Sequence, residues 1–256
     1  MLKDLVREAK LSIRAVLILF SLRRPILIFQ FGKVGSTTIC RTLDKNNRSS
    51  LHMHELTDNR EVRAVADLIR AKVPGWKVIT LVRDPVAREV SYFFQNLDSE
   101  TTTPYVGTRS YVLSLSRERL GQLFVEKMCD LKEHPFEWFN RFIRPSFGLD
   151  VFLEPFDKER GFQIYKTSIA DILLIRYENL WNEGKKAIAD FVHLKQLEWT
   201  PNNISSDKYY AKQYKTFKEE FIMPKKYIEE IYKSPYVEKF YTTDEIEIFK
   251  QAWRTK

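Results

Sequence analysis

The chain has few cysteines, few glycines and no long hydrophobic run. Its two cysteines, Cys40 and Cys129, have no close partner in the sequence and no metal-type spacing, which excludes a disulfide framework and favours a reducing, cytoplasmic compartment. With only 8 glycines and no low-complexity tract, no segment has the composition of a disordered region. A chain of 256 residues can bury a substantial core, so we expect one folded domain over residues 1–256.

The longest early apolar stretch, residues 15–22, is too short to span a bilayer, which takes about 20 apolar residues. Arg14, Arg23 and Arg24 bracket it, and no small-residue cleavage site follows. We therefore expect neither a transmembrane segment nor a signal peptide. The pattern predicts a basic amphipathic helix that either packs on the fold or makes peripheral contact with a membrane surface.

The net charge of +8 favours anionic partners: nucleotide phosphates, acidic glycans, nucleic acid or a membrane surface. Lysines and arginines are spread along the chain, and no zinc-finger or RNP pattern accompanies them. We therefore do not expect a nucleic-acid partner.

Short apolar, β-rich runs alternate with helical patterns along the chain. Strands are predicted at 25–31, 49–53, 76–82 and 173–177, and helices at 37–44, 61–72, from 85 and from 182. Thr242 and Glu245 form a capping box before a C-terminal helix. This alternation predicts an α/β fold with a mainly parallel sheet flanked by helices and a ligand at the carboxyl ends of the strands.

The turn after the first predicted strand has the composition of a phosphate-binding loop. Backbone N–H groups and the helix dipole at the start of the next helix favour an anion, two glycines allow close approach, and a lysine and three hydroxyls add donors. The alternative is an ordinary glycine-containing turn. The lysine precedes the last glycine, so this is not a Walker A loop. The candidate binding residues are Gly32, Lys33, Val34, Gly35, Ser36, Thr37 and Thr38.

A second candidate phosphate site follows the strand at 76–82. Arg83 ends the strand, Asp84 and Pro85 have the types expected at a helix N-cap and first turn, and Ser91 lies within the helix. An arginine fork and a hydroxyl together suit a phosphate dianion. Arg88 shares a helix face with Ser91 and either adds to this site or pairs with a carboxylate.

These two elements resemble the nucleotide site of sulfotransferases that use 3′-phosphoadenosine 5′-phosphosulfate (PAPS). The lysine and the following Gly-Ser-Thr-Thr turn are similar to the family's 5′-phosphosulfate loop, although Gly32 stands where many members have proline. The resemblance implies a P-loop-like sheet, contact of Lys33 with the leaving phosphate, and binding of the 3′-phosphate by Arg83 and Ser91. It also implies that no metal is needed.

Three further segments, at 148–156, 174–180 and 232–241, resemble the bacterial family of capsular polysaccharide synthesis proteins, which is itself sulfotransferase-like. We expect Tyr177 and Glu178 to brace the nucleotide loop, with plain core packing as the alternative. We expect residues 98–170 to form a mainly helical insertion that lines the acceptor site. Together with the C-terminal helices, this insertion should cap the sheet.

Sulfuryl transfer to a hydroxyl needs a general base within hydrogen-bond reach of the acceptor. His52 and His54 follow the second predicted strand, where alternation places both on one face and Glu55 on the other. This pair looks like the histidines of uronosyl 2-O-sulfotransferases, whereas glutamate is the base in other carbohydrate members. We assign the base to His54, with Glu55 as second choice, against the alternative that the histidines only cap or pack. No third ligand stands at a spacing typical of zinc sites.

The sequence thus predicts a PAPS-dependent sulfotransferase domain that acts on a carbohydrate hydroxyl and releases 3′-phosphoadenosine 5′-phosphate (PAP). Two alternatives remain open. One is a nucleotide-binding protein of capsule synthesis that has lost the chemistry. The other is a P-loop-type kinase, which would need a magnesium-binding carboxylate beside a Walker-type loop.

Overall fold

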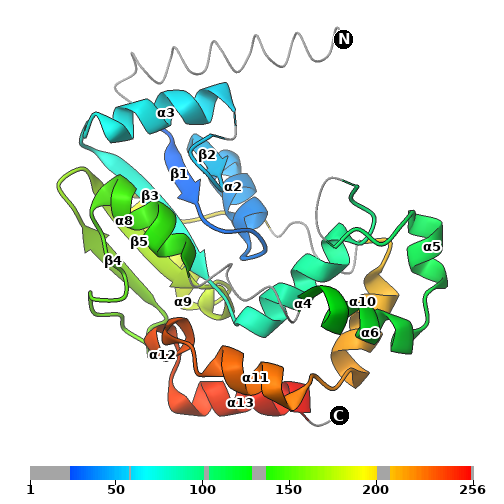
Figure 1. Cartoon of the computed structure of the whole chain (residues 1–256). Coiled ribbons are helices and arrows are strands. Elements are labelled where there is room, and N and C mark those ends of the chain that lie inside the picture. Colours follow the sequence, from blue (N-terminus) through cyan, green and yellow to red (C-terminus); the bar gives the residue numbers. More distant parts are fainter. Residues whose placement is uncertain (1–23, 58, 101–103, 129–136, 201–207, 255–256) are drawn as a thin grey trace, which may run out of the picture. The chain divides into compact units, whose positions relative to one another are not determined.

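The computed structural model describes residues 24–57, 59–100, 104–128, 137–200 and 208–254 (Figure 1). These residues form two compact units. The first comprises the described residues up to Val82 together with Trp138–Thr200, and the second those of Arg83–Glu137 and from Pro201 onward. The helix predicted at 15–22 and Cys129 lie outside the described residues. The single sulfotransferase-like domain over 1–256 stays a prediction.

The first unit is built on a five-stranded sheet with strand order β2-β1-β3-β5-β4 (Figure 1). Its strands are β1 (Ile26–Phe29), β2 (Ser50–Met53), β3 (Trp76–Val82), β4 (Phe162–Lys166) and β5 (Ala170–Arg176). The neighbours β2, β1, β3 and β5 pair in parallel, which confirms the predicted α/β fold. All four residues of β1 are buried, as expected of a central strand covered on both faces.

Strand β4 lies in the segment 98–170, which the sequence analysis predicts as a mainly helical insertion and where it predicts no strand. It pairs antiparallel with β5 at the edge of the sheet. Only Phe162 and Tyr165 of its five residues are buried. A short edge strand with so little buried surface carries a weak hydrophobic signal, and its place depends on pairing with β5.

Helices surround the sheet of the first unit (Figure 1). They are α2 (Ser36–Lys45), α3 (Arg60–Arg70), η1 (Phe139–Ile143), α8 (Arg144–Phe147), η2 (Tyr177–Asn179) and α9 (Glu183–Phe191). Helix α2 packs on β1 and β2, and α9 packs on β5. The ring of Phe29 in β1 makes edge contacts with Trp138, Phe142 and Phe147, which places this aromatic cluster against the centre of the sheet.

The described part of the second unit is helical. Its helices are α4 (Pro85–Asn96), α5 (Arg109–Ser114), α6 (Arg117–Met128), α10 (Ala211–Glu220), α11 (Lys225–Tyr232), α12 (Pro235–Phe240) and α13 (Thr243–Arg254). Phe93 and Phe94 of α4 pack with Phe124 and Phe217 in its core. Apolar side chains three and four apart on these helices meet on one face, so the fold of this unit follows the helical period.

The predicted capping box is confirmed at the start of α13. The Thr242 backbone N–H donates to Glu245 Oε2 at 2.9 Å, and the Glu245 N–H donates to Thr242 Oγ1 at 3.3 Å. Each side chain thereby satisfies a backbone donor that the helix leaves without an intrahelical acceptor.

Two segments of the predicted site, both in the first unit, lie at one edge of the sheet. Because β1 and β2 are parallel, their carboxyl ends at Phe29 and Met53 lie at the same edge. The phosphate loop follows the first of these strands, and the histidine pair spans the end of the second. Arg83 follows β3 in the sequence and belongs to the second unit.

Candidate functional site

The phosphate loop connects β1 to α2 through a backbone that turns twice into the left-handed region. Lys33 has φ 74° and Gly35, the residue before the first turn of α2, has φ 97°. Glycine adopts such angles without strain, whereas a lysine there costs roughly 1 to 3 kcal/mol. Strained backbone conformations of this kind cluster at functional sites, and here the strain falls on a lysine in a loop at a helix N-terminus.

Gly35 is required by close packing as well as by its backbone angle. A Cβ atom at this position would lie 3.0 Å from Cδ2 of Tyr177 and 3.3 Å from Cδ2 of Leu180. Tyr177 begins the turn that follows β5, so its ring supports the loop from the carboxyl end of a strand that β3 separates from β1. The predicted bracing contact between Tyr177 and the loop is therefore present.

The N-terminus of α2 has the features of an anion site. Among the described residues no side chain caps this helix, and its first turn contains no acidic residue. Ser36, Thr37 and Thr38, which carry hydroxyl groups, lie in that first turn. Lys33 precedes the helix by three residues and is half-buried. N-terminal backbone N–H groups and a lysine ammonium group together favour a phosphate.

The imidazole of His54 lies beside this loop with its tautomer defined. Its Nδ1 is 2.7 Å from the backbone oxygen of Gln30. A carbonyl oxygen can only accept, so Nδ1 carries the proton and Nε2 of the neutral ring is the acceptor. A Cβ atom at Gly32 would lie 3.9 Å from His54 Cε1, which places the ring over the loop backbone.

The histidine segment is held by the contact between its two rings and by one tryptophan hydrogen bond. The rings of His52 and His54 meet edge to face with centroids 4.5 Å apart, which confirms that they share one side of the chain. Trp138 is buried and donates its indole N–H to the backbone oxygen of His54 at 3.1 Å. Glu55 is exposed. The sequence analysis missed Trp138 because it is 84 residues away and no local pattern signals the contact.

In the second unit, the predicted N-cap of α4 is confirmed. The Asp84 carboxylate accepts the backbone N–H groups of Val86 at 3.2 Å and Ala87 at 3.3 Å. Ala87 and Ser91 are four residues apart on one helix face, and both are half-buried, as is Arg83 just before the N-cap. Ser91 in α4 and Arg83 just before its N-cap are thus both partly accessible, whereas the other residues of α4 are mostly buried.

Arg88 takes the second of its two predicted roles. Its guanidinium contacts Glu89 Oε1 at 2.5 Å, both side chains are buried, and the guanidinium carbon lies 4.9 Å from the centroid of the Tyr92 ring. A buried arginine paired with a buried carboxylate is structural, because removal of either charge leaves the other uncompensated.

Lys218 of α10 adds a cation that the sequence analysis missed. Its ammonium group lies 5.0 Å from the centroid of the Tyr214 ring. Desolvation, followed by the positive charge of Arg83, lowers the pKa of Lys218. Because Lys218 and Arg83 repel one another, binding of an anion near both of them would be favourable.

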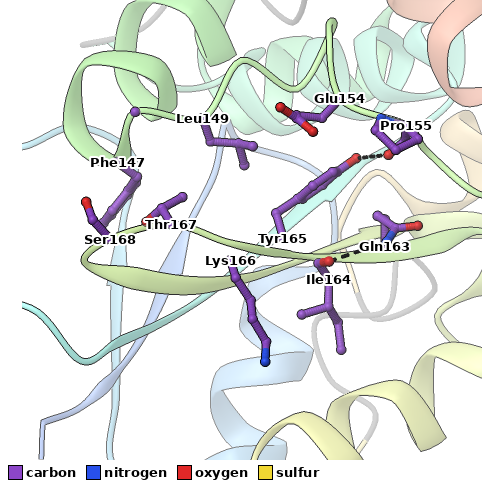
Figure 2. A pocket seen from close by; sticks show the side chains of 11 residues that line it. Phe147, Leu149, Glu154, Pro155, Gln163, Ile164, Tyr165, Lys166, Thr167 and Ser168 are labelled. Carbon is purple, nitrogen blue, oxygen red and sulfur yellow. Dashed lines mark hydrogen bonds between the residues drawn. The ribbon is translucent and has the colours of Figure 1, made fainter.

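A separate hollow opens beside edge strand β4, with a volume of about 430 Å³ (Figure 2). The hydroxyl of Tyr165 points away from the strand and donates to the backbone oxygen of Pro155 at 2.9 Å (Figure 2). Glu154, Gln163 and Lys166 contribute polar groups to the lining. None of the predicted site residues lines this hollow.

None of the described helices combines the length and the apolar character needed to span a membrane. Within the same residues, no three histidine, cysteine, aspartate or glutamate side chains are grouped as metal ligands.

Residues 119–242 match the profile of a protein family described as "Putative capsular polysaccharide synthesis protein". The matched region contains the three segments, at 148–156, 174–180 and 232–241, that carry the resemblance to capsular polysaccharide synthesis proteins in the sequence analysis. The phosphate loop, His54, Arg83 and Ser91 precede the matched region. Comparisons with curated proteins and with solved structures found no match.

Proposed function

We propose that this protein is a sulfotransferase that moves the sulfuryl group of PAPS to a hydroxyl of a carbohydrate acceptor. The observation that carries the proposal is that His54, whose Nε2 is the acceptor nitrogen, lies beside the phosphate loop that contains Lys33. The first element suits the departing phosphate and the second suits the attacking hydroxyl. The match to a capsular polysaccharide synthesis family supports a carbohydrate as the acceptor.

Each chemical role falls to a residue of suitable type. His54 Nε2 accepts the proton of the acceptor hydroxyl as its oxygen attacks sulfur. The bond between sulfur and the phosphate oxygen breaks, and Lys33 with the N-terminus of α2 stabilises the negative charge that develops on that oxygen. Arg83 and Ser91 bind the 3′-phosphate, and Lys218 adds positive charge near Arg83.

The direct test is an assay with labelled PAPS and a panel of polysaccharide hydroxyl acceptors, run with and without EDTA. We expect transfer that persists in EDTA and needs no added magnesium, because lysine, arginine and a helix N-terminus supply the positive charge. A kinase would instead transfer phosphate from ATP and stop when the metal is chelated. Binding of PAP without turnover on any acceptor would favour the nucleotide-binding protein that has lost the chemistry.

The assignment of the base is tested by two matched variants. We expect His54→Ala to lower the maximal rate by about 100- to 10,000-fold, because proton transfer to a positioned base supplies an effect of this size. Glu55→Gln, which removes the adjacent exposed carboxylate, should keep the wild-type rate. A large loss in Glu55→Gln with a near-normal rate in His54→Ala would reverse the assignment.

A further inference from the structure

The C-terminal segment Tyr232-Lys233-Ser234-Pro235-Tyr236 has a specific contact with the start of α4 that the proposed function does not use. Tyr232 ends α11 and Tyr236 lies in the first turn of α12. Ser234 caps α12 by accepting the N–H of Val237 at 3.4 Å, and its hydroxyl donates to the backbone oxygen of Ile231 at 2.7 Å. This short turn between two helices holds both tyrosine rings in the core of the second unit, where both are buried.

The hydroxyl of Tyr236 contacts both backbone polar groups of Arg83. It accepts the Arg83 N–H at 3.0 Å and donates to the Arg83 carbonyl oxygen at 3.0 Å. The pairing of β3 with β5 ends one residue earlier, at Val82 and Arg176. Arg83 is therefore beyond the ladder, and the phenol supplies the donor and the acceptor that a neighbouring strand would have supplied.

The neighbouring residue is held in the same way. The Tyr232 hydroxyl donates to Asp84 Oδ1 at 2.6 Å, while the carboxylate accepts the N–H groups at the start of α4. Burial raises the pKa of Asp84, and the hydrogen bond from Tyr232 opposes that rise. Two phenols four residues apart thus anchor two consecutive residues, Arg83 through its backbone and Asp84 through its side chain.

We propose that Tyr236 is a positioning residue for nucleotide recognition, which sets the preference for a 3′-phosphate by fixing the backbone of Arg83. The proposal rests on the proposed function, in which Arg83 binds that phosphate. Because both backbone polar groups of Arg83 are hydrogen-bonded, its backbone conformation is fixed, and this fixes the direction in which its side chain leaves the backbone. Without the hydroxyl, the guanidinium must be ordered when the phosphate binds, which weakens binding.

The test compares the affinities of PAP and AMP by calorimetric titration in wild type, Tyr236→Phe, Tyr232→Phe and Tyr165→Phe. Tyr236→Phe keeps the ring and loses both bonds to Arg83, so we expect its affinity for PAP to fall by about three- to tenfold and its affinity for AMP to stay within about twofold. Tyr232→Phe leaves both bonds of Tyr236 in place and should keep most of the preference for PAP.

Tyr165→Phe is the matched control for the loss of a buried tyrosine hydrogen bond. It removes one bond to a backbone oxygen in the first unit and should lower the melting temperature without changing the ratio of the two affinities. Melting curves establish that each variant is folded before titration. An unchanged ratio in Tyr236→Phe, or an equal change in Tyr165→Phe, would overturn the positioning role while leaving the proposed function in place. Equal affinity of wild type for PAP and AMP would overturn both.

Discussion

Replacing Lys33 with glycine is expected to lower the rate of sulfuryl transfer by about 100- to 1,000-fold, with a much smaller loss of nucleotide affinity. In the proposed mechanism, the ammonium group neutralises charge that grows on the phosphate oxygen as the bond to sulfur breaks, so its loss should act mainly on the transition state. The loop backbone and the first turn of α2 should still bind the ground-state nucleotide. Turnover and PAP binding, measured on the same variant, separate the two effects.

Glycine is the informative replacement because Lys33 has a left-handed backbone with φ 74°. Lys33→Ala would retain the strain and remove the charge, whereas Lys33→Gly removes the charge and relieves the strain. Lys72 is the matched control, since it is a lysine with φ 57° in the turn after α3. The Lys72→Gly variant should transfer the sulfuryl group at the wild-type rate. Near-normal transfer by Lys33→Gly would exclude a catalytic role for Lys33.

The second large effect is expected on nucleotide selectivity. Wild type should bind PAP at least about tenfold more tightly than AMP, because a charge-assisted arginine contact and a hydroxyl bond to the 3′-phosphate are each worth about 1 to 3 kcal/mol. Arg83→Ala should lose most of this preference by weakening PAP, with little change for AMP, which lacks the phosphate. Lys218→Ala should lose a smaller part, since Lys218 lies within the electrostatic reach of Arg83.

The control for this experiment must be chosen from the structure. Arg88 is unsuitable, because Arg88→Ala would leave Glu89 buried without its partner and destabilise the second unit. Arg119 on α6 is exposed and pairs with Glu126 at 3.2 Å, so Arg119→Ala should leave both affinities unchanged. Equal affinity of wild type for PAP and AMP would overturn the assignment of Arg83 and Ser91 to the 3′-phosphate and, with it, the proposed use of PAPS.

The sequence predicts those parts of the protein that depend on neighbouring residues. The succession of strand, turn and helix at residues 26–45, the Asp84 cap with Pro85 after it, and the Thr242 capping box all agree with the structure. Each depends on a hydrophobic period or on hydrogen bonds between residues two to four apart, which a linear pattern records. The assignment of Lys33, Arg83 and Ser91 to phosphates comes from resemblance and stays a prediction.

The tertiary structure alone decides how those elements are supported. Strand β4 needs β5 to pair with, and its antiparallel direction has no local signal. The tautomer of His54 depends on the carbonyl oxygen of Gln30, and the Tyr236 hydroxyl reaches Arg83 across 153 residues of sequence. Such contacts bury polar groups that need partners, and the partner is selected by which surfaces pack together. The sequence by itself therefore determined the order of strands, turns and helix caps, and the packing decided which distant groups hold the candidate site residues in place.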